Sequence, residues 1–248
     1  MLCSGVRIIS ATTREETKLP YVKKMIYSGR FLEIEKYPVN KNGNRIRRSG
    51  KYKMSSEAQQ NLNEKNAKKC FSRLVECNFT DKDVFVTLKY GGNKPDSAQL
   101  KKDFQNFLRR LKYKCKKRGY PDPKYVGVSH DGSERPHHHL ILTGYSWDFI
   151  KSLWDKGSVH ISNLVSDEEY GYIQVSKYIM NEKNNNTFSK RWCASQNLAK
   201  PVIKTQPIKR LNIYSRVEAP KGYKIIDVEI TDNVFTGTYQ YVRCVRIN

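Results

Sequence analysis

Long apolar stretches and paired cysteine motifs are both missing from this sequence of 248 residues. No run approaches the ~20 apolar residues that a membrane-spanning helix needs. The N-terminus lacks the charged and apolar regions of a secretory signal. The six cysteines are scattered and form no Cys-x-x-Cys pair, which argues against a cysteine-based zinc site. These absences predict a cytoplasmic protein that does not interact with a membrane.

Acidic residues are also scarce relative to basic ones. The chain has 46 Lys and Arg residues against 24 Asp and Glu residues, which gives a formal net charge of +22. A positive field of this size concentrates polyanions around a protein and speeds their association. The charge therefore predicts a nucleic-acid partner, although a basic structural protein such as a ribosomal one has a similar composition.

The hydrophobic pattern predicts an α+β protein with one main core. The order of elements implies a largely antiparallel sheet with helices packed on one side of it. The predicted core spans 80–201, preceded by a basic segment and a packed helix (1–79) and followed by a strand-rich tail without an assigned role (202–248). The predicted helices are 56–77, one capped by Asp96 and ended by Gly119, 146–154, and one opened by a Ser166–Glu169 capping box and ending near Met180; the predicted strands are 84–88, 125–130, 137–142 and 158–162.

Four of the five histidines lie within ten residues of one another, at His130, His137, His138 and His139. Side chains alternate between the two faces of a strand, so His137 and His139 project to one side and His138 to the other. Two imidazoles on one face form a bidentate metal site. If strands 125–130 and 137–142 form a hairpin, His130 becomes a third ligand. An exposed histidine edge without function is the competing interpretation.

Two tyrosines on the predicted helix near residue 175 differ in their surroundings. Tyr172 shares the apolar side of the helix with Ile173 and Ile179, which is typical of a core aromatic residue. Tyr178 lies among polar neighbours and can face a site. A tyrosine oxygen can act as a covalent nucleophile, so Tyr178 is the candidate.

Three motifs in this order resemble the HUH endonuclease superfamily, and within it the rolling-circle replication initiators of small bacterial plasmids and single-stranded DNA phages. The resemblance implies an α+β fold with a ferredoxin-like or palm-like β-α-β-β-α-β core. It covers about residues 20–201 and is strongest over 83–183. The matching stretches are Phe85–Tyr90 for the apolar strand, Arg135–Leu142 for the two histidines, and Lys177–Lys183 for the tyrosine helix.

The sequence departs from the family pattern at three places. The residue between the two motif histidines is His138 instead of an apolar residue. His130 stands where relatives often carry a ligating glutamate. Asn181 follows Tyr178 by three residues where the family has a lysine, which leaves Lys177 or Lys183 to supply that charge.

By this resemblance, a divalent cation, Mg²⁺ or Mn²⁺, is held by His137, His139 and His130 and polarises the scissile phosphate of DNA. Tyr178 attacks phosphorus, which gives a 5′-phosphotyrosyl enzyme and a free 3′-OH. The implied substrate is single-stranded origin DNA in a bacterial cell. No Gly-x-x-x-x-Gly-Lys-Ser/Thr loop occurs in the chain, so a host helicase is expected to unwind the duplex and a host polymerase to extend the 3′ end.

Other functions remain open at this point. The same chemistry serves transposases and relaxases. A non-catalytic, basic nucleic-acid-binding protein with a structural metal fits the charge and the histidines. A metal-dependent hydrolase that uses water as its nucleophile fits them too. A second tyrosine, Tyr170 or Tyr172, is a further alternative within the initiator family.

Overall fold

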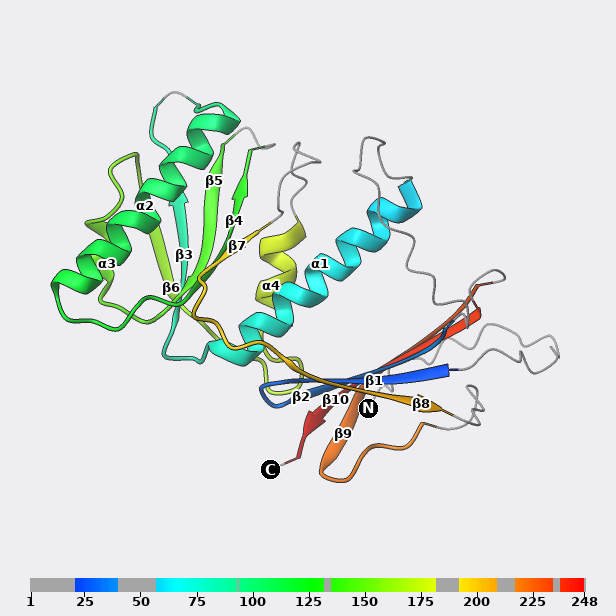
Figure 1. The fold of residues 1–248 in the computed structure, drawn as a ribbon. Helices are drawn as coiled ribbons and strands as arrows, with labels where there is room; N and C mark the ends of the chain where they lie inside the picture. The colour runs from blue at the N-terminus through cyan, green and yellow to red at the C-terminus, as the bar shows by residue number, and fades with distance from the viewer. Residues whose placement is uncertain are drawn as a thin grey trace, which may run out of the picture.

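The computed structural model describes residues 21–39, 57–92, 94–131, 135–181, 192–208, 217–233 and 237–247. Within these ranges the chain forms two five-stranded antiparallel sheets and four helices packed on them (Figure 1). The α+β class predicted from the sequence is therefore confirmed. None of the helices in the described ranges is long and apolar enough to cross a membrane.

The central sheet has the strand order β6-β3-β5-β4-β7. The antiparallel pairing of β4 with β5 confirms the predicted hairpin. Its strands are β3 (Val84–Lys89), β4 (Tyr125–His130), β5 (His137–Leu142), β6 (Val159–Asn163) and β7 (Cys193–Ala194), and the helices are α1 (Glu57–Asn78), α2 (Ser97–Lys117), α3 (Trp147–Lys151) and α4 (Ile173–Asn181).

Helices cover both faces of the central sheet, so the predicted one-sided arrangement is wrong. On one face, Leu88 and Leu140 pack with Phe107 of α2 and Ile150 of α3. The other face supplies a second core, in which α1 and α4 contribute. The reason is visible in β3 and β5, where consecutive apolar residues place hydrophobic side chains on both faces of the sheet.

The boundaries of α2 agree with the sequence signals. The Asp96 carboxylate accepts a hydrogen bond from the Gln99 backbone N–H at 2.7 Å, which satisfies one of the free donors of the first turn. Gly119 follows the helix with a φ of +69°, a conformation that glycine adopts without a steric penalty.

Helix α4 begins at Ile173, seven residues after the predicted capping box. Instead of opening a helix, the Asp167 carboxylate accepts hydrogen bonds from the backbone N–H groups of Glu169 and Tyr170. Gly171, with a φ of +62°, then turns the chain before the helix starts. A local turn thus replaces the first turns of the predicted helix, because an Asp side chain can satisfy nearby backbone donors outside a helix.

The second sheet has the order β8-β1-β2-β10-β9 and combines segments from both ends of the described chain. The β1–β2 hairpin was not predicted; Gly29, at a φ of +56°, occupies its turn. This hairpin pairs on one side with β8 and on the other with β10, so the strand-rich tail joins the N-terminal segment. The strands are β1 (Tyr21–Ser28), β2 (Phe31–Pro38), β8 (Val202–Ile208), β9 (Tyr223–Asn233) and β10 (Gly237–Arg246).

Helix α1 lies between the two sheets (Figure 1) and is joined to the second sheet by buried ion pairs. The Arg73 guanidinium contacts Glu33 at 2.6 Å and Glu35 at 2.9 Å. The Tyr241 hydroxyl donates a third hydrogen bond to this group, onto Glu33 at 2.9 Å. Removal of one partner from such a buried pair leaves an uncompensated charge, so the network fixes how the second sheet sits on α1.

Glu76 of α1 is a buried carboxyl at the same junction. It accepts a hydrogen bond from the Tyr172 N–H at 2.7 Å and lies 3.7 Å from the Arg243 guanidinium. Burial nevertheless outweighs these contacts and raises the pKa of Glu76 to about 7.

This raised pKa predicts a pH-dependent stability that Glu76→Gln removes. The folded protein binds the proton more tightly than the unfolded chain, so the stability contributed by Glu76 is full below pH 4.5 and is lost as the pH rises towards 7. Relative to the wild type, the Gln variant should therefore gain up to about 3 kcal/mol between those pH values. Urea unfolding at a series of pH values measures the difference, and a constant difference from pH 4.5 to 8 would contradict the raised pKa.

Candidate metal centre

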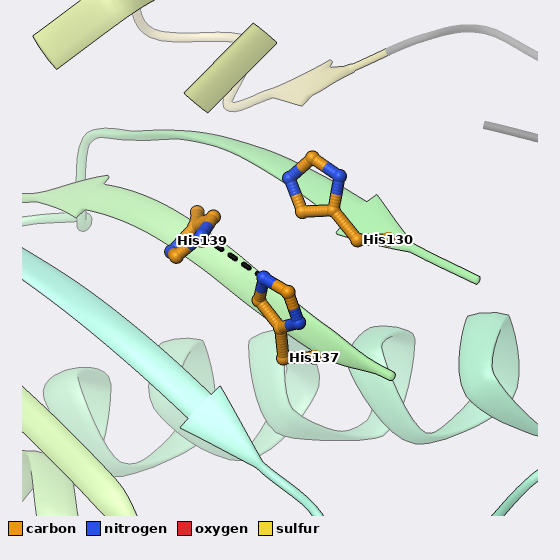
Figure 2. Close-up of side chains that lie close together, drawn as sticks. All are labelled: His130, His137 and His139. Carbon is orange, nitrogen blue, oxygen red and sulfur yellow. Dashed lines mark hydrogen bonds between the residues drawn. The ribbon is translucent and has the colours of Figure 1, made fainter. Parts of the chain in front are cut away.

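Three histidine side chains converge on one face of the central sheet. The β4–β5 register places His130 directly opposite His137, and the alternation of β5 places His139 on the same side as His137. One nitrogen from each ring lies within 4.8 Å of the other two. Figure 2 shows the three rings projecting from the two neighbouring strands, with the contact between His137 and His139 dashed. These three side chains could hold a metal ion.

The outer nitrogens of two of these rings are held by hydrogen bonds. His137 Nδ1 lies 2.9 Å from the Arg135 carbonyl oxygen, which can only accept, so Nδ1 carries the proton and Nε2 has a lone pair. His139 Nδ1 lies 3.0 Å from the Thr87 hydroxyl, which can accept a proton from Nδ1. Such contacts to the outer nitrogen orient a histidine for metal binding through Nε2.

The spacing of the two Nε2 atoms fits a shared cation. They lie 3.0 Å apart. Two nitrogens at the usual ~2.1 Å from a metal, in neighbouring positions at right angles, are separated by about the same distance. Burial, with the neighbouring imidazoles, lowers the pKa of His139 to about 3, so this ring is neutral at physiological pH and offers a lone pair.

His138 points to the opposite face and is outside the cluster. Its ring stacks on Phe104 of α2 at 4.5 Å, and burial lowers its pKa to about 3. Ser129 Oγ lies 2.8 Å from Nδ1 and Tyr90 Oη lies 3.0 Å from Nε2. The ambiguity over which histidines face the site is thereby removed: His138 takes an interior position on the α2 side.

The hydrogen bonds of His138 form a directional chain. The Tyr90 hydroxyl also bonds to the buried Asp103 carboxylate, which accepts its proton. Tyr90 Oη must therefore accept from His138 Nε2–H, and Ser129 donates to Nδ1. Tyr90 is thus occupied on the α2 side of the sheet, and β5 is anchored at the residue between the two candidate ligands.

Tyr178 of α4 lies beside this histidine cluster. Its ring centroid is 5.3 Å from that of His139 and 6.1 Å from that of Phe85. Phe85 also stacks on His139 at 5.2 Å, so the three rings form one aromatic group. Tyr178 is 58% exposed, which leaves its hydroxyl accessible to a large substrate.

The other tyrosines near α4 have different environments. Tyr172 is 6% exposed and belongs to the core, as its apolar neighbours predicted. Its hydroxyl donates a hydrogen bond to Asp81 at 2.8 Å, and burial raises its pKa. Tyr170 lies before α4, in the turn capped by Asp167. Of the three, Tyr178 is the one with a ring contact to the histidine cluster.

Positive charge near Tyr178 comes from a residue that the sequence did not indicate. Lys68 of α1 donates a hydrogen bond to the Asn181 side chain at 3.2 Å, one helical turn from Tyr178. Lys68 also contacts Glu64 at 3.0 Å. Lys177 is exposed on α4, and Lys183 lies outside the described residues.

Two further contacts of the cluster, Thr87 and Phe85, were recognised from the sequence only as parts of an apolar strand. Both belong to β3, where Thr87 pairs with His139 across the sheet. A threonine within an otherwise apolar strand was the available signal, because a buried hydroxyl usually has a hydrogen-bond partner. Its partner depended on the β3–β5 register, which the sequence alone did not provide.

The fold and the cluster define an α+β protein with a candidate three-histidine metal centre beside an exposed helical tyrosine. Residues 83–183 match the family model for the replication-associated protein ORF2. This span runs from the start of β3 through α4 and includes the three histidines and Tyr178. The similarity supports a role in DNA replication. Neither the curated proteins nor the solved structures contain a significant match to the chain.

Proposed function

We propose that this protein is a replication initiator that nicks and rejoins single-stranded origin DNA through a 5′-phosphotyrosine formed by Tyr178. The observation that carries the proposal is the contact between the Tyr178 and His139 rings, which brings a possible nucleophile to a possible metal centre. The match to a replication-associated family over the same residues supports the same function. Residues 80–201 would form the nuclease core.

His130, His137 and His139 would hold a divalent cation, Mg²⁺ or Mn²⁺, which would supply Lewis-acid polarisation of the scissile phosphate. Magnesium is the more strongly oxygen-seeking of the two ions, whereas imidazole ligands favour manganese. The chain's own part is to present two Nε2 atoms 3.0 Å apart from a strand anchored on its other face by His138.

The cleavage step is a transesterification. The Tyr178 oxygen loses its proton to solvent and bonds to phosphorus, and the bond from phosphorus to the 3′ oxygen of the preceding nucleotide breaks. The released 3′ oxygen takes up a proton. Because the phosphotyrosine conserves the energy of the broken ester, attack by a 3′-OH on it reverses the reaction and rejoins the strand. Lys68, and Lys177 on α4, would contribute positive charge near the phosphate.

A conjugation assay with strand-specific labels tests this proposal. The probe is a pool of single-stranded oligonucleotides of randomised sequence, incubated with the full chain and Mn²⁺ and separated on a denaturing protein gel. A 3′ label should migrate with the protein, whereas a 5′ label should appear on a shortened oligonucleotide. EDTA should abolish both products. Cleaved DNA without any conjugate would instead indicate a water nucleophile.

The related functions of the same chemistry differ in the second strand that they accept. An initiator rejoins the ends that it released, so a circular single strand should be recovered after nicking. A transposase would join the 3′ end to an unrelated target strand. Sequencing of joined products from a mixture of labelled strands distinguishes the two. A non-catalytic DNA-binding protein with a structural metal would give neither product.

A further inference from the structure

A strongly basic surface covers the solvent side of α2, away from the histidine cluster. The helix contains eight Lys and Arg residues and a single acidic one, Asp103, which is buried. Lys102, Arg109 and Lys116 are exposed and seven residues apart, so they lie in one row along the helix. The basic stripe is defined as this row and its exposed neighbours on the same side: Lys101, Lys102, Arg109, Lys112, Lys116 and Lys117.

The composition of this face differs from that of an ordinary solvated helix. Helix α1 alternates acidic and basic residues and forms an ion pair between Lys68 and Glu64. Among the described residues, no member of the basic stripe forms an ion pair; the nearest pair on α2 is Arg110 with Asp155 at 3.2 Å. Like charges at a spacing of three or four residues destabilise a helix. The repulsion in the stripe would be relieved by a polyanion.

The side chains around the row indicate which polyanion fits. The stripe lacks exposed aliphatic residues, so it has no apolar group to insert into a lipid surface. Single-stranded nucleic acid is bound with several stacking aromatic rings. Tyr113, 64% exposed beside Arg109, is the aromatic residue on this side of α2. A straight row of cations with one aromatic ring is suited to the phosphate backbone of a duplex.

The length of the row is also suited to a duplex. From Lys102 to Lys116 the helix rises about 21 Å, which corresponds to about six base pairs at 3.4 Å each. Since α2 and the histidines lie on opposite faces of the central sheet, a duplex on α2 leaves the candidate metal centre free.

One end of the basic stripe lies near the histidine end of the sheet. Ser97, the first residue of α2, donates a hydrogen bond at 2.9 Å to Asp131, which directly follows His130. A DNA strand that leaves the N-terminal end of α2 therefore reaches the edge of the sheet where His130 and His137 are located. The basic stripe and the candidate metal centre are separate surfaces that one DNA molecule could span.

We infer that the basic stripe of α2 binds the phosphate backbone of duplex DNA, as a second surface beside the proposed nicking site. The binding is sequence-independent, because the contacts are made to phosphates. Only the idea that this duplex flanks the nicked strand rests on the proposed function; the binding itself does not.

The test compares two variants of the full chain that each lose three charges. Lys102→Gln/Arg109→Gln/Lys116→Gln neutralises the row, and Lys200→Gln/Lys204→Gln/Lys221→Gln neutralises three exposed lysines outside α2. Binding to a blunt 20-base-pair duplex is measured by fluorescence anisotropy over a range of salt concentrations. Loss of three phosphate contacts should reduce the slope of log affinity against log salt by about 2.7 and weaken binding about 100-fold at 0.1 M salt.

The control variant should keep the wild-type slope. An equal reduction in both variants would overturn the inference, because it would show an effect of net charge alone. So would an unchanged slope in the α2 variant, or a loss confined to single-stranded DNA. Conjugation to a saturating short single strand should be the same in the α2 variant and the wild type. This readout separates the two hypotheses: failure of nicking in the wild type would leave duplex binding by α2 intact.

Discussion

Substitution of Tyr178 by Phe is expected to abolish the covalent protein–DNA conjugate, with a loss of at least about 10³-fold in its rate of formation. Phe lacks the oxygen that bonds to phosphorus but keeps the ring that packs beside His139 and Phe85. The substitution therefore removes the nucleophile while retaining its packing. The measurement is the single-turnover yield of 3′-labelled conjugate, with DNA binding measured in parallel and expected to stay within about twofold of the wild type.

Two neighbouring tyrosines provide matched controls for this variant. Tyr170→Phe should retain the conjugate, because Tyr170 lies outside α4 in a separate turn. Tyr172→Phe removes a buried hydrogen bond to Asp81 and should lower the stability by about 1 kcal/mol while the conjugate persists. A conjugate that is undiminished in Tyr178→Phe but lost in either control would assign the nucleophile to that tyrosine and contradict the proposed role of Tyr178.

The parts of the fold that could be predicted from the sequence are those with local causes. The Asp96 cap and Gly119 determine where α2 begins and ends, and both act on residues within one turn. The β4–β5 hairpin brings together strands that are close in the sequence, so its alternation was enough to place His137 and His139 on one face. The exposure of Tyr178 followed in the same way from its polar neighbours.

The features that were missed depend on contacts between distant residues. The second sheet pairs β1 with β8, which are separated by most of the chain, and no local pattern predicts such a partner. Similarly, Lys68 reaches Asn181 only because α1 packs against α4. The late start of α4 has a different cause: the Asp167 carboxylate satisfies the backbone of a turn, where the sequence signal indicated a helix cap.

The candidate site combines both kinds of information. Its histidines come from a hairpin that the sequence indicates, and its tyrosine comes from a helix that the tertiary packing brings to them. The contacts that orient the site are long-range: Thr87 meets His139 through the β3–β5 register, and Tyr90 and Asp103 reach His138 from β3 and α2. Residue types alone therefore identified the possible ligands, whereas their support became visible only in the structure.

The double substitution His137→Ala/His139→Ala is expected to eliminate both Mn²⁺ binding and conjugate formation. It removes the two Nε2 atoms that lie 3.0 Å apart and leaves His130 as the only histidine of the cluster. A single imidazole holds a divalent cation weakly, so the affinity measured by calorimetry should fall at least about 100-fold. The conjugate should be lost to the same extent as in Tyr178→Phe.

A matched control and a stability measurement show what kind of metal site this is. His160 is an exposed histidine on β6 outside the cluster, and His160→Ala should keep Mn²⁺ affinity and conjugation at the wild-type level. The double variant should also remain folded without metal, because the central sheet has apolar cores on both faces. Unfolding of the wild type by EDTA, together with wild-type DNA binding and no conjugate in its presence or absence, would instead identify a structural metal. Mn²⁺-dependent conjugation that survives the double substitution would place the working cation elsewhere in the protein.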